Sequence, residues 1–185
     1  MLALDDACRR EELRAEVVGV VGDRPCPGLL KAQERGIPVR AVTPGEHASR
    51  RDWNLAMRAT VVSMAPDLIV SAGFMRVLAP SFVDAFPGRL INLHPALLPS
   101  FPGPHAVRDA LAAGVEVTGC TVHFIDHEVD HGPVIARQRV PVELGDTEES
   151  LHARIKAVEH RLLPRACAFV LNSLERTARE AGAQR

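Results

Sequence analysis

The stretch that decides the fold runs from Arg89 to His105 and reads Arg-Leu-Ile-Asn-Leu-His-Pro-Ala-Leu-Leu-Pro-Ser-Phe-Pro-Gly-Pro-His. Its first half is apolar and predicts a buried strand, which Pro95 ends because proline has no backbone N–H to donate. Asn92 and His94 are the polar exceptions, and their spacing of two places both side chains on one face of the strand. The sequence thus predicts a carboxamide and an imidazole at the carboxyl end of a strand, where open parallel α/β sheets bind ligands. Satisfied polar packing in the core is the alternative for an isolated Asn-x-His.

Composition narrows the class of protein. The chain has 185 residues, of which 46% are hydrophobic, and a formal net charge of -1. These values suit one globular domain and argue against a surface that coats nucleic acid. No apolar run approaches the roughly 18–20 residues that span a bilayer, and acidic residues follow the N-terminus too closely for a signal peptide. The four cysteines are far apart, so we expect a cytoplasmic protein without disulfides or a zinc site.

The first half of the chain alternates strands with helices. Strands are predicted over residues 15–21, 37–42 and 67–71, and helices over 1–14, 27–36 and 47–64. Short loops between elements in this order predict right-handed crossovers between parallel strands. We therefore expect an α/β protein with a Rossmann-like, open, mostly parallel sheet and helices on both faces.

The second half predicts a different pattern. Short helices are expected over 80–86 and 107–113, followed by strands over 117–125 and 134–142 that pair antiparallel. The sequence from Asp146 to Glu149 matches a capping box that opens a long helix. Pro164 should kink or divide that helix, and the polar tail of 175–185 should fray.

Asn92, His94 and Asp130 form a candidate catalytic triad. Asp130 lies in the charged loop between the two antiparallel strands. A carboxylate beside an imidazole fixes its tautomer and raises its basicity, and a carboxamide N–H can stabilise an oxyanion. Together these groups suit direct transfer of an acyl group to an amine, because no Ser or Cys stands in a nucleophile turn.

Two other interpretations concern histidines near this loop. Six potential ligands are clustered in the sequence, but their spacing matches no metal-binding pattern: His123, Asp126, His127, Glu128, Asp130 and His131. A solvated charged loop is the favoured interpretation, and no metal is predicted. His105 either faces the same crevice or serves as a capping or turn residue.

Linked motifs then reveal a resemblance. The chain carries Asn92-x-His94-Pro95-x-Leu-Leu-Pro-x-Phe-Pro-Gly103, preceded by Gly73-Phe-Met-Arg-x-Leu78 and followed by Asp130-x-Gly-Pro133. From about residue 1 to about residue 170 it resembles the glycinamide ribonucleotide (phosphoribosylglycinamide) formyltransferases. These enzymes of purine biosynthesis use 10-formyltetrahydrofolate. The related methionyl-tRNA enzyme usually has Arg-Gly after Leu-Leu-Pro, which favours the purine family.

The resemblance implies a role for each matching position. Asn92 and His94 would polarise the formyl group, and Asp130 would hold His94 and move a proton from the attacking amine. The implied folate pocket uses Met75, Arg76, Val77, Leu78, Asp126 and Asp130. The implied substrate site for the ribonucleotide uses Gly73, Pro95, Gly103, His105 and Glu159, with Glu159 contacting the ribose hydroxyls. A homodimer is possible, and the expected partners are small molecules rather than nucleic acid or membrane.

The chain also departs from the family pattern. The family begins with a strand and a Gly-x-Gly-Ser-Asn-like loop that holds the substrate phosphate, and Met1 aligns just beyond that loop. The usual C-terminal strand pair is missing or replaced by 175–185. We therefore expect residues 1–185 to form a single formyltransferase-like domain that is N-terminally truncated, through a start assigned too late or as a damaged relative. The alternatives are a non-catalytic folate-binding relative, or a formyltransferase or hydrolase that uses the same triad with another acceptor.

Overall fold

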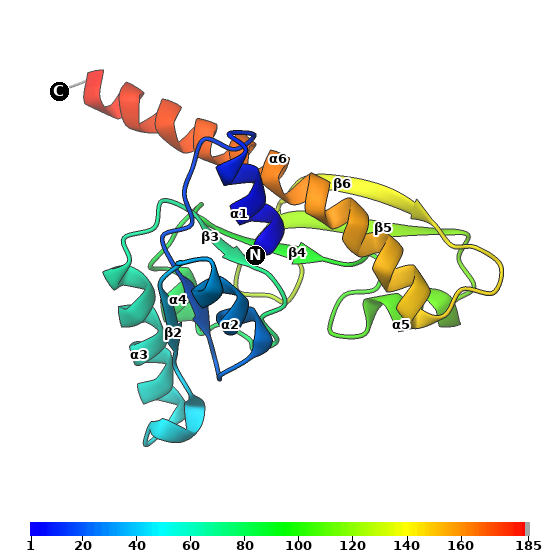
Figure 1. Ribbon diagram of the computed structural model, residues 1–185, viewed down its shortest axis with the longest axis horizontal. Coiled ribbons are helices and arrows are strands. Elements are labelled where there is room, and N and C mark those ends of the chain that lie inside the picture. The colour runs from blue at the N-terminus through cyan, green and yellow to red at the C-terminus, as the bar shows by residue number, and fades with distance from the viewer. Residues whose placement is uncertain (184–185) are drawn as a thin grey trace. The chain divides into compact units, whose positions relative to one another are not determined.

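The computed structural model describes residues 1–183, which form two compact units, one spanning Met1–Leu90 and the other beginning at Ile91. Each unit combines helices with strands, as the ribbon in Figure 1 shows. In the part of the chain that the structure describes, the strands form open sheets. The predicted α/β class is therefore confirmed.

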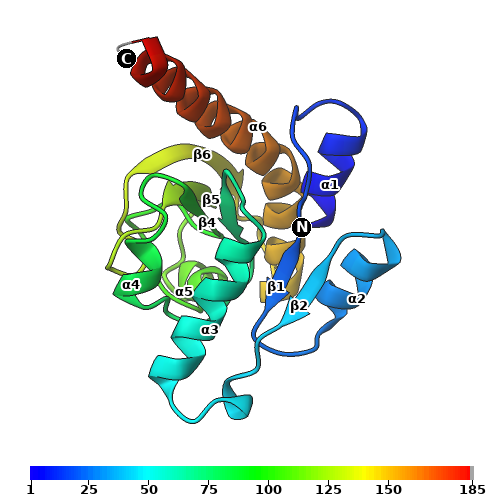
Figure 2. The same cartoon turned by 90° about the vertical axis from the view of Figure 1, so that its left-hand side faces the viewer.

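The first unit contains a parallel strand pair with a connecting helix. Its elements in chain order are α1 (Leu2–Arg9), β1 (Val20–Gly22), α2 (Pro27–Glu34), β2 (Val39–Ala41), the 3-10 helix η1 (Pro44–Glu46), α3 (Arg50–Ser63), β3 (Ile69–Ser71) and α4 (Pro80–Val83). Val20 of β1 is paired with Val39 of β2, and α2 lies beside this pair (Figure 2). The predicted parallel crossover is thus present.

Local sequence explains where these helices begin and end. Pro27 occupies the first turn of α2, where its missing N–H would have no helical partner, and Gly36 follows the helix with a φ of 77°. Ser49 caps α3 because its hydroxyl accepts a hydrogen bond from the backbone N–H of Asp52 at 3.1 Å. Trp53 on that helix is almost completely buried.

The second unit is an antiparallel sheet with two helices. Its elements are β4 (Leu90–His94), α5 (Ala106–Ala112), β5 (Val117–Phe124), β6 (Val134–Pro141) and α6 (Glu148–Ala183). β5 pairs antiparallel with both β4 and β6, which confirms the predicted pairing of the last two strands. α6 contacts both β5 and β6, and it runs alongside them in Figure 1.

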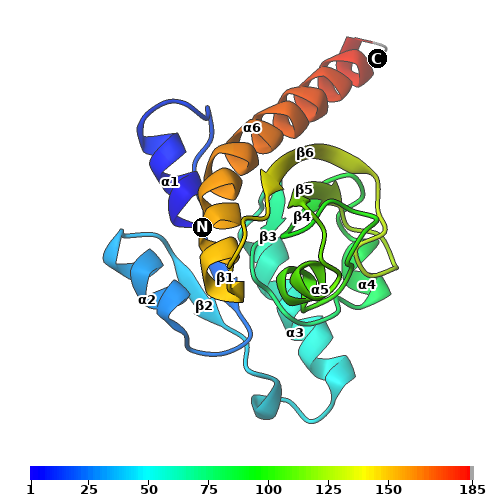
Figure 3. The same ribbon diagram turned by 90° about the vertical axis from the view of Figure 1, so that its right-hand side faces the viewer.

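An apolar cluster holds this unit together. Val107 of α5 packs with Cys120 and Val140 of the sheet and with Leu151 and Ile155 of α6. α5 and the first turns of α6 lie together in Figure 1 and in Figure 3. The cluster anchors the strands whose ends carry the polar side chains described below.

The structure corrects the prediction for the last helix. α6 is one helix of 36 residues that continues through Pro164, so the expected division is wrong. Leu163 and Ala166 are buried on either side of Pro164, and this burial offsets the lost hydrogen bond. The tail expected to fray is helical as far as Ala183, and residues 184–185 lie outside the described part.

The helix start and the first strand are also corrected. The backbone N–H groups of Thr147 and Ser150 each donate to the other residue's hydroxyl, so the capping box lies one residue beyond the predicted one. Asp146 instead binds Arg154 through two hydrogen bonds of 2.7 and 3.0 Å.

The strand predicted over 15–21 is shorter in the structure, where it spans Val20–Gly22. β-Branched residues favour an extended backbone, but they do not supply the partner strand that a ladder requires.

Within residues 1–183, no helix combines the length and the apolar character needed to cross a bilayer.

Candidate active site

The structure brings together the three side chains of the predicted triad. Asn92 and His94 project from β4, and Asp130 projects from the loop between β5 and β6. The Asn92 Nδ2 group donates to Asp130 Oδ1 at 3.2 Å, and His94 Nδ1 lies 3.3 Å from Asp130 Oδ2. A carboxamide, an imidazole and a carboxylate therefore meet at the end of β4, all within the second unit.

Two residues at the site have strained backbone. Phe101 and Asp130 have φ angles of 56° and 55°, in the left-handed region that side chains other than glycine rarely adopt. The loop before Phe101 is held by the buried Thr121 hydroxyl, which donates to Ala96 O at 2.7 Å and accepts from Leu98 N at 3.1 Å. Thr121 thus holds the loop that leads to the strained Phe101.

The Phe101 carbonyl sets the tautomer of His94. His94 Nε2 lies 2.8 Å from that oxygen, and a carbonyl oxygen can only accept, so Nε2 carries a hydrogen. The neutral ring then presents an unprotonated Nδ1 to Asp130, and a second proton placed there gives an imidazolium that donates to the carboxylate. The carboxylate therefore stabilises the protonated ring, while the tautomer of the neutral ring depends on Phe101.

The surroundings of Asp130 favour its ionised form. Burial raises the pKa of Asp130, but the hydrogen bond from the Gly103 N–H and the charge of His94 favour the ionised group, and the pKa is lowered below its ordinary value. The Gly103 N–H donates to Asp130 Oδ2 at 2.8 Å. Asp130 is accordingly a carboxylate at neutral pH.

A fourth side chain, His123, belongs to this cluster. It is 1% exposed, and its Nε2 lies 3.2 Å from Asn92 Nδ2 and 3.5 Å from Asp130 Oδ1. The sequence pattern alone groups His123 only with the residues of the charged loop. The signal that identifies it is the strand register, because His123 on β5 lies directly opposite Asn92 on β4.

The other residues predicted in the second unit are distributed around this cluster. Gly103 contacts Asp130 directly, whereas His105 is exposed at the N-terminus of α5 and makes no capping hydrogen bond through its side chain. Asp126 Oδ2 lies 3.2 Å from His131 Nδ1. Pro95 is half-buried and directly follows β4.

Glu159 is a buried acid on α6. Only 8% of the residue is exposed, and burial raises the pKa of its carboxyl group against a smaller opposing effect of Lys156. On an amphipathic helix an acid is expected on the solvent face, so burial at this position needs a structural or functional reason.

The predicted folate loop lies in the first unit. Gly73 has a φ of 74°, and the side chains of Met75 and Val77 are exposed by 68% and 64%. Arg50 donates to the Val77 carbonyl at 2.7 Å, and Arg76 pairs with Asp23. The loop is therefore anchored by two guanidinium groups while its apolar side chains, with Leu78 half-buried beside them, face outward.

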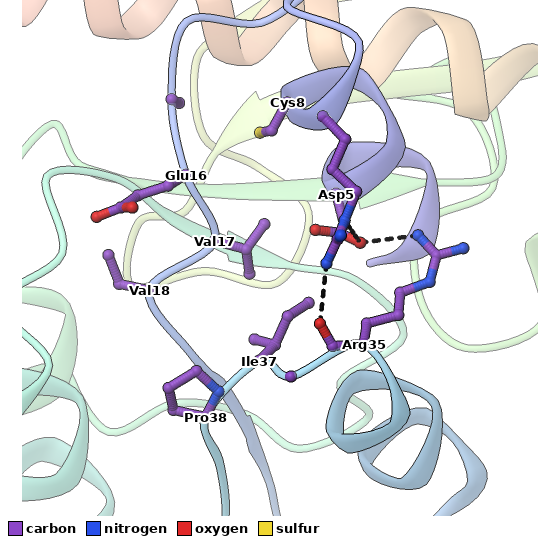
Figure 4. A pocket seen from close by; sticks show the side chains of 11 residues that line it. Asp5, Cys8, Glu16, Val17, Val18, Arg35, Ile37 and Pro38 are labelled. Carbon is purple, nitrogen blue, oxygen red and sulfur yellow. Dashed lines mark hydrogen bonds and ion pairs between the residues drawn. The ribbon is translucent and has the colours of Figure 1, made fainter.

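The first unit also contains a surface pocket of about 550 Å³ near α1. Figure 4 shows Asp5 and Arg35 at its polar end and Val17, Val18, Ile37 and Pro38 along its apolar wall. Asp5 accepts hydrogen bonds from Arg9 at 2.9 Å and from Arg35 at 2.8 Å, and the Arg35 bond is the main reason that the pKa of Asp5 is lowered. The carboxylate of Asp5 is thus paired with two guanidinium groups of the pocket.

No group of three or more His, Cys, Asp or Glu side chains within residues 1–183 is arranged to hold a metal ion.

Known proteins share both the sequence and the fold. The Formyl transferase family matches residues 1–167. Phosphoribosylglycinamide formyltransferase of Mycobacterium tuberculosis is 53% identical over 154 residues, which are 83% of this chain and 72% of the relative. The Escherichia coli protein of the same name is 39% identical over 163 residues, 88% of this chain and 77% of that one.

Solved structures agree with this. Glycinamide ribonucleotide transformylase 1 from Symbiobacterium toebii has a TM-score of 0.89 at 41% identity and covers 92% of this chain and 81% of its own. Phosphoribosylglycinamide formyltransferase from Bacillus halodurans has a TM-score of 0.87 at 36% identity, with coverage of 92% and 88%. With the motifs, the fold and these matches in agreement, the chain belongs to the formyl transferase family.

Proposed function

We propose that this protein transfers a formyl group from 10-formyltetrahydrofolate to the amine of glycinamide ribonucleotide. The observation that carries the proposal is that the side chains of Asn92 and His94 lie 3.2 and 3.3 Å from the carboxylate of Asp130. The curated relatives named phosphoribosylglycinamide formyltransferase support the choice of acceptor, and a folate-derived formyl donor is in keeping with the family.

Asn92 and His94 stabilise the charge that develops during transfer. Attack of the substrate amine on the formyl carbon forms a C–N bond and places negative charge on the formyl oxygen. An N–H group of Asn92 and the positive charge of protonated His94 are suited to stabilise that oxyanion. Collapse of the tetrahedral intermediate breaks the bond to the folate nitrogen, which takes up a proton as it leaves.

Asp130 manages the proton of the attacking amine. Its carboxylate stabilises the His94 imidazolium, and as the anionic group of the cluster it can accept a proton from the amine, directly or through water. The lowered pKa of Asp130 keeps the group ionised at neutral pH, as this role requires.

The remaining residues suit binding of the two substrates. Met75 and Val77, exposed in the loop after β3, offer apolar contact for a planar folate ring. Buried Glu159 would accept hydrogen bonds from the ribose hydroxyls, which would satisfy its carboxylate when the nucleotide is bound. We place the reaction in the cytoplasm, in keeping with cysteines that form no disulfide within residues 1–183.

A direct assay tests the proposal. Protein, 10-formyltetrahydrofolate and glycinamide ribonucleotide are mixed, and formation of tetrahydrofolate and formylated ribonucleotide is measured. We expect His94→Ala to lower kcat by about 10²–10⁴-fold, the usual contribution of a positioned acid–base group. The matched control is His152→Ala, which removes an exposed histidine of α6 and should leave kcat unchanged.

Other outcomes would indicate another function. Full activity in the His94→Ala variant would contradict the assigned role. Release of formate without acceptor would indicate a hydrolase that uses the same cluster. Folate binding seen by calorimetry without turnover on any amine would indicate a binding protein.

A further inference from the structure

The Phe124 carbonyl defines the protonation of the buried imidazole of His123. His123 Nδ1 lies 2.8 Å from that oxygen. Since a carbonyl oxygen can only accept a hydrogen bond, Nδ1 carries the hydrogen. The neutral ring therefore has a lone pair at Nε2 and can act there only as an acceptor.

Asn92 is the group that uses this acceptor. Its Nδ2 atom can only donate, and it lies 3.2 Å from His123 Nε2 and 3.2 Å from Asp130 Oδ1. The carboxamide has two N–H groups, so each neighbour receives one of them. Both donors of Asn92 are thereby directed, one toward a neutral ring and one toward a carboxylate.

The distances argue against a charged His123. An imidazolium would donate from Nε2 to Asp130, but that separation is 3.5 Å, longer than the contact with Asn92. It would also turn an N–H of His123 toward the N–H groups of Asn92. Exposure of only 1% disfavours a charged ring further, because water cannot solvate it.

We propose that His123 is a positioning residue: its neutral ring, held as the Nδ1–H tautomer by the Phe124 carbonyl, accepts a hydrogen bond from Asn92 and fixes the orientation of that carboxamide. The inference rests on the proposed function, in which an Asn92 N–H meets the formyl oxygen. A carboxamide rotated by half a turn would present its oxygen to the oxyanion instead, which would be repulsive. Because His123 is neutral, the Asn92 N–H that it accepts can shift readily to the formyl oxygen as that oxygen gains negative charge.

The backbone around His123 is built to hold this arrangement. His123 faces Asn92 directly across the antiparallel β4–β5 ladder. The Phe124 N–H donates to the Pro133 carbonyl at 2.8 Å, so the residue that receives the Nδ1 hydrogen is itself tied to the chain just before β6. A ring that turned over would lose its hydrogen bond to the Phe124 carbonyl.

Two substitutions separate positioning from packing. His123→Leu removes the acceptor, and we expect kcat to fall about 10- to 100-fold, as for other residues that orient a reactive group, with KM for both substrates unchanged. His123→Gln places a carbonyl oxygen near the former Nε2 atom and should recover most of the loss. Thr118→Val is the control, since it changes another buried polar residue of β5 whose hydroxyl has no partner, and it should leave kcat unchanged.

A spectroscopic measurement tests the inference without turnover. Long-range ¹H–¹⁵N correlation on the labelled chain distinguishes the two neutral tautomers of histidine from the imidazolium. We expect the Nδ1–H tautomer for His123 at neutral pH, assigned from its loss in His123→Gln. An Nε2–H tautomer or an imidazolium would overturn the proposal, as would unchanged kcat in His123→Leu or equal losses in both variants. Failure of the wild-type chain to formylate the ribonucleotide would count against the proposed function alone, because the tautomer would still be read.

Discussion

Gly132, two residues after Asp130, is the position at which one added methyl group should do the most harm. A Cβ atom built there would lie 1.9 Å from the Phe124 carbonyl oxygen, and Cβ atoms in proteins do not approach closer than 3.0 Å. Gly132→Ala must therefore shift the two segments apart by about 1.1 Å, from 1.9 to at least 3.0 Å. The contact is with backbone, so no side-chain rotation can relieve it.

The expected loss of stability follows from the hydrogen bonds that the backbone of Phe124 makes. Its carbonyl accepts from His123 and its N–H donates to Pro133, each at 2.8 Å, and a shift of this size breaks such bonds. At about 1 kcal/mol for each hydrogen bond, the free energy of unfolding should fall by about 2 kcal/mol. With a typical urea dependence of about 1–3 kcal/mol per M, the unfolding midpoint should drop by about 1 M.

Activity should fall by more than the loss of stability explains. A displacement of about 1 Å in groups that position a reacting centre is worth about 10²-fold in rate, so kcat should fall by about that factor under conditions in which the variant is folded. Gly182→Ala is the control, because an added Cβ meets nothing within 4 Å and α6 should be unchanged or slightly stabilised. A Gly132→Ala variant with the wild-type midpoint and kcat would refute the reasoning.

The other predictions concern charge and stability. The pKa of Asp130 is lowered on folding, so ionised Asp130 stabilises the fold above about pH 4. This contribution is lost as the pH falls through the folded pKa. Urea unfolding should show the loss in the wild-type protein and not in Asp130→Asn. The pKa of Glu159 is raised by burial, so stability is lost as pH rises through its titration range. Glu159→Gln should therefore raise the urea midpoint at pH 7 but not near pH 4, and it should raise KM for the ribonucleotide. Trp53→Phe removes the 2.7 Å hydrogen bond from the indole to Val42 O and weakens the stacking of Arg50, which lies 4.4 Å from the ring centre. The free energy of unfolding, measured by circular dichroism in urea, should fall by about 1–2 kcal/mol. An unchanged midpoint in that variant would show that neither contact contributes.

Much of the fold could be predicted from local patterns. Alternating apolar residues identified β5 and β6 and their antiparallel pairing, and proline, glycine and capping residues bounded α2 and α3. The limits of the elements were less predictable, since the length of β1 depends on a partner strand that its own sequence does not specify. For the same reason Pro164 did not divide α6, because burial on both sides of it compensates locally for a missing hydrogen bond.

For the candidate site, the sequence by itself determined which chemical groups are present. The spacing of Asn92 and His94 placed them on one face of a strand, and the linked motifs added Asp130. Only the tertiary structure placed His123 against Asn92, 31 residues away in the chain, and chose the carbonyls that set the tautomers of His94 and His123. The physical reason is that side-chain periodicity specifies the face on which a residue lies, whereas its hydrogen-bond partners depend on strand register and on backbone atoms that carry no sequence signal.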